Sequence, residues 1–171
     1  VTDLKLNAGA GNIDVVGGKN IVAKATGTIT IDEDDDATTA ATIEKITIDG
    51  LGAVSAIGAT GSLDALKELT VKNSTGTGTS TLAVTTAVET LKVNLDNSNS
   101  TGALTLTDAK LKTLNVDASG KESTVEFDTT STILETINIS GNAELTLADD
   151  VGAKDIVSTN TKGVTITDVL A

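Results

Sequence analysis

The sequence lacks most of the side chains on which enzyme and metal chemistry depends. It contains no histidine, cysteine, arginine, proline, tryptophan, tyrosine or methionine, and Phe127 is its single aromatic residue. Without histidine or cysteine there is no imidazole base, no thiolate nucleophile and no ordinary zinc, copper, haem or iron–sulfur site. Hard cations that prefer oxygen ligands, such as calcium, remain the natural metal partners. We therefore expect a protein that is not an enzyme.

The charge balance argues against nucleic acid as a partner. Twenty-four acidic residues against twelve lysines give a net charge of −12. That charge repels a phosphate backbone, and the chain has no arginines to read bases and no aromatic surface to stack on them. No apolar run approaches the roughly 20 residues that a membrane-spanning helix needs, so we expect no membrane insertion. Strong acidity together with abundant Thr, Ser, Gly and Asn favours an extracellular location.

The length of the chain suits one domain with a core built from Val, Ile, Leu and Ala. With 171 residues the chain can bury a sizeable core without aromatic side chains.

Nothing at Val1 resembles a signal peptide. We therefore expect the chain to be a fragment or a processed product of a longer protein.

What the sequence has instead is one repeated phrase. The phrase reads apolar, polar, any residue, apolar, any residue, apolar. It occurs as IEKITI (43–48), LKELTV (66–71), VETLKV (88–93), LKTLNV (111–116), LETINI (134–139) and, weakened, AKDIVS (153–158). Its fourth position recurs at intervals of 23, 22, 23, 23 and 19 residues. A period of this size is typical of repeat architectures.

A second short alternating segment follows most copies of the phrase, such as ALTLTD (103–108) and VTITD (164–168). Alternation of Val, Ile, Leu and Thr between Gly, Asn and Ser is typical of strands. The sequence therefore predicts an all-β protein, a parallel β-solenoid (β-helix) of about seven to eight coils with a 22–23-residue repeat. We expect residues 1–171 to form one domain, in which 41–171 are regular and the less regular 1–40 form either N-terminal coils or a cap.

One column of charges supports this stacking independently of hydrophobicity. The residue after the first apolar position of each phrase alternates in sign along the chain: Lys19, Glu44, Lys67, Glu89, Lys112, Glu135 and Lys154. In a parallel stack these residues become neighbours, so opposite charges lie side by side. Exposed ion pairs contribute only about 0–1 kcal/mol each, and we assign the ladder a role in setting register.

Two other structures compete for parts of this pattern. SLDALKEL (62–69) has leucines at helical spacing behind Ser62, but its alignment with the other phrases favours a turn that enters a strand. A leucine-rich repeat shares the L-x-x-L-x-L core but expects Asn or Cys three residues after its last leucine. One repeat alone conforms here, at Asn142.

Acidic residues are the only candidates for a metal site. Aspartates end the second strand of several coils, and four lie in the run DEDDD (32–36), although five adjacent acids usually mark a solvated loop. They could bind calcium between coils, or each could cap its own turn by accepting backbone hydrogen bonds. The candidate calcium ligands are Asp108, Asp128, Asp149, Asp150 and Asp168, with Asp32, Asp34 and Asp36 in the acidic run.

Two further hypotheses rest on single residue types. A hydrolase that uses two carboxylates is one hypothesis, because Asp and Glu are plentiful. The chain lacks, however, the aromatic platforms that sugar-binding clefts use. Outward threonine pairs resemble the flat arrays of ice-binding solenoids, although Thr also favours strands in general. These pairs are Thr28 with Thr30, Thr105 with Thr107, and Thr165 with Thr167.

The phrases LKTLNVDASG, GALTLTDA and LETINISGNAELTLADD resemble the repeats of Gram-negative surface-layer (S-layer) proteins exported by type I secretion. The resemblance covers roughly residues 40 to 171 and is one of repeat style and composition. It implies β-solenoid regions, assembly into a cell-surface lattice, and calcium at lattice contacts. The chain departs from many relatives because it has no G-G-x-G-x-D nonapeptides.

The sequence thus predicts a structural building block of a bacterial surface layer. We expect its partners to be other copies of itself or neighbouring domains, which would cover at least one end of the solenoid, with cell-surface polysaccharide as a further candidate. The second hypothesis is an extracellular adhesin or adhesin spacer, and the third is an ice-binding solenoid.

Overall fold

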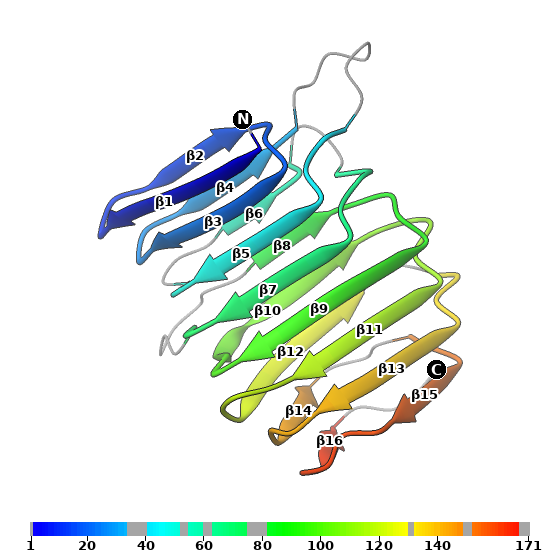
Figure 1. The fold of residues 1–171 in the computed structure, drawn as a ribbon. Helices are drawn as coiled ribbons and strands as arrows, with labels where there is room; N and C mark the ends of the chain where they lie inside the picture. Colours follow the sequence, from blue (N-terminus) through cyan, green and yellow to red (C-terminus); the bar gives the residue numbers. More distant parts are fainter. Residues whose placement is uncertain are drawn as a thin grey trace.

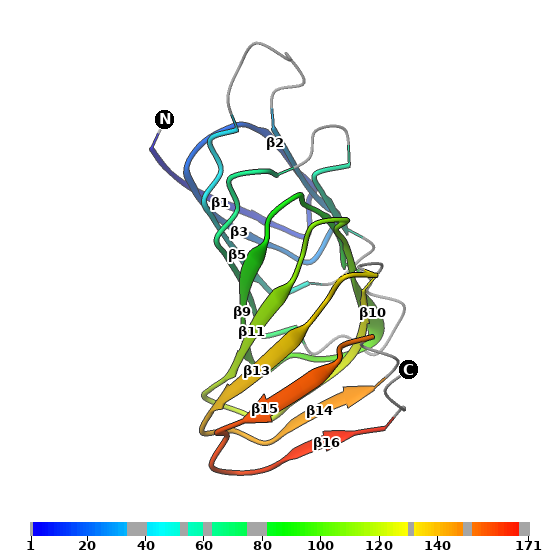
Figure 2. The same ribbon diagram turned by 90° about the vertical axis from the view of Figure 1, so that its right-hand side faces the viewer.

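The fold is a parallel β-solenoid built from two facing sheets. The computed structural model describes residues 2–33, 41–51, 55–59, 63–74, 82–129, 132–148 and 152–167. Within these residues every strand pairs in parallel with strands one coil away, and successive strands alternate between two sheets of eight strands each (Figures 1 and 2). This confirms the predicted all-β solenoid, with two strands in each coil.

We call the sheet of odd-numbered strands sheet A and the sheet of even-numbered strands sheet B. Sheet A contains β1 (Asp3–Gly9), β3 (Asn20–Ala25), β5 (Lys45–Asp49), β7 (Glu68–Lys72), β9 (Thr90–Asp96), β11 (Thr113–Ala118), β13 (Thr136–Gly141) and β15 (Asp155–Ser158). Sheet B contains β2 (Ile13–Val16), β4 (Ile29–Asp32), β6 (Ser55–Ile57), β8 (Leu82–Thr85), β10 (Asn99–Thr107), β12 (Ser123–Thr129), β14 (Leu145–Ala148) and β16 (Val164–Ile166).

Regular spacing holds through the middle of the stack and shortens at both ends. About five turns follow the spacing of roughly 23 residues, such as Ile46 to Leu69. The first coil is shorter, since Leu4 pairs with Ile21. The last is also shorter, since Ile137 pairs with Ile156. Strands β1 to β4, from the less regular first part of the chain, continue the same two sheets.

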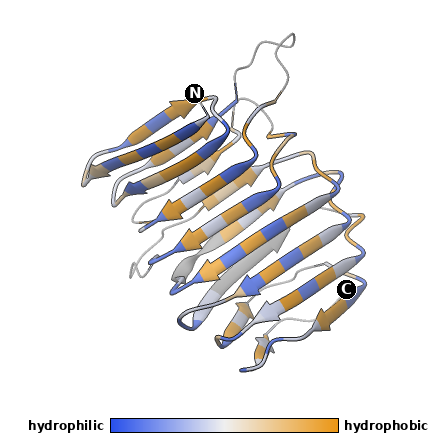
Figure 3. Ribbon diagram, in the orientation of Figure 1, coloured by the Kyte–Doolittle hydropathy of each residue, from blue (hydrophilic) through white to orange (hydrophobic). Residues whose placement is uncertain are grey.

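The core lies between the two sheets and is built from stacked aliphatic side chains. In β11, Leu114 and Val116 are buried while Asn115 between them faces outward, as period-2 alternation requires. The same stripes of apolar and polar residues run across sheet A in Figure 3. The first apolar residue of each phrase lines the corner that leads into sheet A, and Ile43, Leu66 and Leu111 are buried there.

The predicted register is correct at four junctions of the phrase and wrong at one. Ile46 pairs with Leu69, and Leu91, Leu114, Ile137 and Ile156 follow one another as expected. Between β7 and β9, however, Leu69 pairs with Val93 and not with Leu91. A shift of two residues keeps every apolar side chain on the inner face, because side chains alternate with a period of two.

Cross-strand polar pairs explain why the shifted register is favoured. It places Glu68 opposite Lys92, and Lys72 opposite Asp96. The predicted register would instead have set Lys67 against Glu89, so the continuous ladder expected from the sequence is interrupted there. Two pairs of opposite charge thus replace one, each stabilising by about 0.2–1 kcal/mol.

A row of buried serines supports the turn from sheet A to sheet B. Ser74, Ser98 and Ser123 are almost completely buried. Their hydroxyls bond to the backbone of neighbouring coils: Ser74 Oγ accepts from the Leu51 amide at 3.1 Å, and Ser123 Oγ accepts from the Ser98 amide at 3.1 Å. Each serine thereby satisfies backbone groups that the turn would otherwise leave unpaired.

The competing helix is not formed in the part of 62–69 that the structure describes. Residues 63–67 form a turn, in which the Leu66 amide donates to the Leu63 carbonyl at 3.1 Å, and β7 begins at Glu68. The turn keeps Leu63 and Leu66 buried.

The stacked core gives a direct prediction for Leu114→Ala. The substitution leaves a cavity between β9 and β13, so we expect the free energy of unfolding to fall by about 2–5 kcal/mol. Urea denaturation followed by circular dichroism measures the change. Asn115→Ala, on the outer face of the same strand, is the matched control and should cost far less. Equal losses in the two variants would contradict the assigned inner face.

Candidate functional site

Asp108, one of the predicted calcium ligands, caps the corner between sheet B and sheet A. Its carboxylate is buried, with an exposed fraction of 1% for the residue. One oxygen accepts from Thr86 Oγ1 at 2.5 Å and from the Val88 amide at 3.0 Å in the preceding coil. The other accepts from the amides of Lys110 at 2.7 Å and Leu111 at 3.1 Å. Four donors match the usual acceptor capacity of a carboxylate, so this geometry is that of a turn cap.

Glu33 performs the same role three coils earlier. Its Oε1 accepts from the amides of Thr42 at 2.7 Å and Ile43 at 2.6 Å. Glu33 follows Ile31 by two residues, and Asp108 follows Leu106 by two. Ile31 and Leu106 belong to the same row of paired residues in sheet B. Glu33 was not predicted as a functional residue, because a run of five acids is ordinarily a solvated loop. The signal in the sequence was the position that Glu33 shares with Asp108, two residues after an inward-facing apolar residue.

The other predicted ligands divide into three groups. Asp32 ends β4 and is buried, and its carbonyl accepts from the Gly17 amide at 2.8 Å. The backbone of Asp128 lies in β12 opposite Thr105. The remaining predicted ligands lie outside the described residues, and calcium binding by them stays a prediction: Asp34, Asp36, Asp149, Asp150 and Asp168. Within the described part of the chain, no three acidic side chains converge as metal ligands would.

Three rows of alternating charge, which we call the sheet A ladders, lie on the outer face of sheet A and along the edge where its strands begin. Every lysine that lies within a strand belongs to this sheet. The rows are Lys19, Glu44 and Lys67; Lys45, Glu68 and Lys92; and Lys24, Asp49, Lys72 and Asp96. Only the first row was predicted from the sequence. The other two rows begin across junctions that keep the predicted register, and the shift between β7 and β9 extends them by Lys92 and Asp96.

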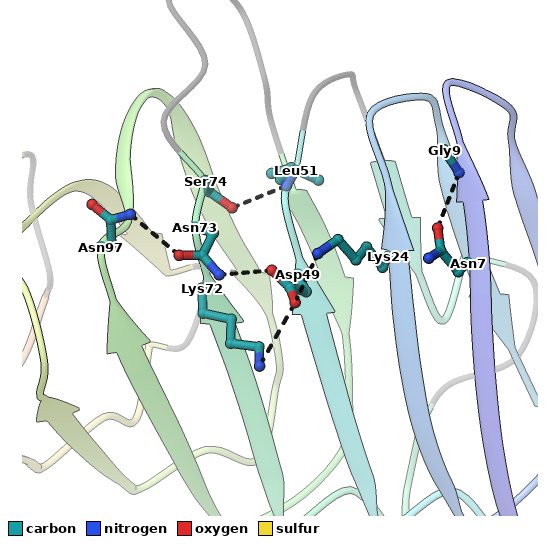
Figure 4. A network of polar contacts seen from close by, with 9 residues as sticks. All are labelled: Asn7, Gly9, Lys24, Asp49, Leu51, Lys72, Asn73, Ser74 and Asn97. Carbon is teal, nitrogen blue, oxygen red and sulfur yellow. Dashed lines mark hydrogen bonds and ion pairs between the residues drawn. The ribbon is translucent and has the colours of Figure 1, made fainter.

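Asp49 occupies the centre of the third row (Figure 4). Its carboxylate lies 3.7 Å from both Lys24 Nζ and Lys72 Nζ, and it accepts from Asn73 Nδ2 at 2.8 Å. Burial alone would raise the pKa of Asp49, but the Asn73 hydrogen bond and the two lysine charges outweigh it and hold that pKa below its ordinary value. The side-chain Nδ2 of Asn97 donates to Asn73 Oδ1 at 3.2 Å and extends the network by one coil.

Glu68 joins three strands in the second row. It pairs with Lys45 at 3.2 Å and accepts from Asn94 Nδ2 at 2.7 Å. Burial again opposes ionisation, and the bonds from Lys45 and Asn94, with the nearby charge of Lys92, lower the pKa of Glu68 overall.

The first row follows the ladder that the sequence predicts. Glu44 lies between two lysines, with Lys67 Nζ at 3.1 Å and Lys19 Nζ at 3.2 Å, and these hydrogen bonds lower the pKa of Glu44. Beyond the interruption the ladder resumes, where Lys112 Nζ lies 3.0 Å from Glu89. The next coil keeps this register, because the Glu135 amide donates to the Lys112 carbonyl at 2.9 Å.

The outer face of sheet B differs sharply from that of sheet A. Its strands contain no lysine, and one paired row reads Thr30, Ala56, Ala83 and Thr105. Two alanines therefore separate Thr30 from Thr105, which belong to two of the three threonine pairs that suggested an ice-binding array. Sheet B offers small, uncharged side chains over these four strands, whereas sheet A offers paired charges.

An open hollow of about 420 Å³ lies at the corner near the first strands. Its charged lining groups are Lys19 and Glu44, which already pair with each other. Among its described lining residues, no set of groups is placed to perform acid–base or nucleophilic chemistry.

Comparisons with known proteins add no family to this description. The chain matches no protein-family model, no curated protein and no solved structure. Among the described residues, no helix is long and apolar enough to cross a membrane. The class that the fold defines is that of parallel β-solenoid repeat proteins.

The ladders predict how stability depends on pH. The pKa values of Asp49 and Glu68 are lower in the folded protein than in the unfolded chain, so their stabilisation is full above the ordinary values of about 3.9 and 4.3. It is lost as the pH falls through the lowered folded values. The D49N/E68Q variant should therefore lose less stability than wild type between about pH 7 and pH 3, as measured by urea midpoints. D14N/E122Q, which neutralises exposed acids outside the ladders, should behave like wild type. An identical acid response in D49N/E68Q would contradict the role of these pairs.

The corner cap predicts a large cost for Asp108→Asn. The amide NH₂ would face backbone N–H donors, and at least two buried donors would lose their acceptor. We expect unfolding free energy to fall by at least about 2 kcal/mol. Asp64→Asn, in an exposed turn, is the control and should stay within about 0.5 kcal/mol of wild type. A D108N variant as stable as wild type would show that the four hydrogen bonds contribute little.

Proposed function

We propose that this protein is a structural building block of a bacterial surface layer, located outside the cell and assembling with other copies of itself. The observation that carries the proposal is the two-sheet stack itself. Its strands join along one axis, and the described strands β1, β2, β15 and β16 each lie at an end of a sheet. Such end strands can accept a further strand by the same pairing that joins the coils.

The charge distribution supports a role in assembly. Lysines and acids on sheet A neutralise one another within the molecule, so the excess negative charge lies elsewhere. A net charge of −12 makes copies of the chain repel one another unless cations intervene. Calcium is the cation that this proposal assigns to the contacts between copies, because it accepts carboxylate and carbonyl oxygens in flexible geometry. Cell-surface polysaccharide is the further partner that the proposal includes.

Light scattering and negative-stain electron microscopy test the proposal directly. We expect the chain to form ordered assemblies in millimolar calcium and to return to monomers on addition of a chelator. Sodium chloride at matched ionic strength is the control and should not replace calcium. A monomer under all these conditions would overturn the proposal and favour an adhesin spacer. Thermal hysteresis in the same samples would favour ice binding.

A further inference from the structure

Nine outward-facing residues form a square grid in the middle of sheet A, on the neighbouring strands β5, β7 and β9 (Figure 1). Two rows of the grid belong to the sheet A ladders, and a row of uncharged residues lies between them. We call these nine residues the central grid: Lys45, Thr47 and Asp49 on β5; Glu68, Thr70 and Lys72 on β7; and Lys92, Asn94 and Asp96 on β9. Three lysines balance three acids, so the central grid is neutral in a chain of net charge −12. Two copies can therefore meet at this face without the repulsion that a net negative face would cause.

Each strand of the central grid carries opposite charges at its two outer positions and an uncharged residue between them. A half-turn about an axis that runs over the middle residues, parallel to the solenoid axis, sets each strand antiparallel to its own copy. Across that axis every lysine of the grid faces an acid of the second copy. The facing pairs are Lys45 with Asp49, Glu68 with Lys72, and Lys92 with Asp96. Each pair forms twice, because a two-fold contact is isologous.

We propose that the central grid binds the central grid of a second copy across this axis, giving a face-to-face dimer. Packed sheets lie about 10 Å apart with their strands nearly aligned, a gap that a lysine and a facing acid can span together. Lys45 already pairs with Glu68 at 3.2 Å within the molecule, and the dimer gives Lys45 a second acid. The inference goes beyond the proposed function, since this contact requires neither calcium nor a surface lattice.

The shifted register between β7 and β9 makes the central grid self-complementary. In the register expected from apolar spacing, Lys92 would lie opposite Thr70, in the middle row. The half-turn would then set Lys92 against the same residue of the second copy, and their repulsion would oppose the contact. The observed shift moves Lys92 to an outer row and places Asn94 on the axis. The shift that interrupts the predicted ladder therefore completes a face on which two copies fit.

The middle row also sets the limits of the contact. This row is uncharged from Val22 on β3 to Asn94 on β9. Beyond these strands it holds Lys5 on β1 and Asp117 on β11, and each would face its own charge across the axis. Four strands at a spacing of ~4.8 Å form a small polar contact, so the dimer is weak. We expect it to form at about 100 µM protein and to dissociate at about 1 µM, where chelated protein is then a monomer.

Substitutions at Thr70 test the axis, because Thr70 faces its own copy there. Within one molecule Thr70 pairs with Thr47 and Asn94, so a new charge meets no charged residue across the strands. Sedimentation velocity at about 100 µM, in low salt with chelator, should show a wild-type dimer. T70K alone and T70E alone should each weaken that dimer by at least about tenfold. An equimolar mixture of the two variants should restore it, since a lysine then faces a glutamate. A83K and A83E, on the outer face of sheet B, are the matched controls and should dimerise like wild type.

D117N provides a second readout that leaves the central grid unchanged. It removes like charges that face each other across the axis, and the asparagine carbonyl can still accept the hydrogen bond from Ser140 Oγ. We expect the dissociation constant of the dimer to fall by at least about twofold. D14N removes one exposed acid from sheet B and changes the net charge equally, so it is the matched control. Binding no tighter in D117N than in D14N would contradict the axis. Sodium chloride at about 1 M should dissociate the wild-type dimer, because salt screens the facing charges.

The outcomes separate this inference from the proposed function. A wild type that is monomeric at about 100 µM in chelator overturns the face-to-face dimer, while its assembly in calcium would still support the proposed function. A wild-type dimer that persists in T70K and T70E, or that their mixture does not restore, uses another surface and also overturns the inference. A chelator-resistant dimer that calcium does not assemble further overturns the proposed function alone.

Discussion

The structure depends on one constraint, which is that each residue of a parallel stack lies beside its counterpart in the next coil. Inside the stack this constraint requires aliphatic rows, because a polar side chain there would meet further apolar surface on both sides. Outside, it forbids runs of like charge, and the sheet A ladders show the result in three rows of alternating sign. Core and surface patterns thus both follow from the geometry of stacking.

The fold followed from the sequence because this constraint repeats itself at every coil. Alternating apolar residues at a fixed interval predicted strands, their direction and the inner face of each. The single register error arose between Leu69 and Val93, where apolar spacing is equally compatible with two alignments. Cross-strand contacts of Glu68 and Lys72 decide between them, and such contacts appear only when two strands are considered together.

The acidic residues were harder to assign because an aspartate at a strand end has two roles that sequence alone does not separate. Asp108 accepts four hydrogen bonds within the protein. Glu33 accepts hydrogen bonds from two backbone amides, although it lies in a run of acids expected to be a solvated loop. The described acids thus have two different roles. Asp108 and Glu33 at the corners bond to the backbone of the turns, and the acids of the sheet A ladders neutralise neighbouring lysines.

The most direct test of this account is the alignment of β7 with β9 in solution. Thr70 lies opposite Asn94 in the structure, whereas apolar spacing alone would set it opposite Lys92. In the cysteine-free chain, T70C/N94C and T70C/K92C can be oxidised as monomers and their disulfide yields compared by mass spectrometry. We expect rapid, nearly complete disulfide formation in T70C/N94C and little in T70C/K92C. The reverse order would contradict the claim that outer-face charges set the register of the stack.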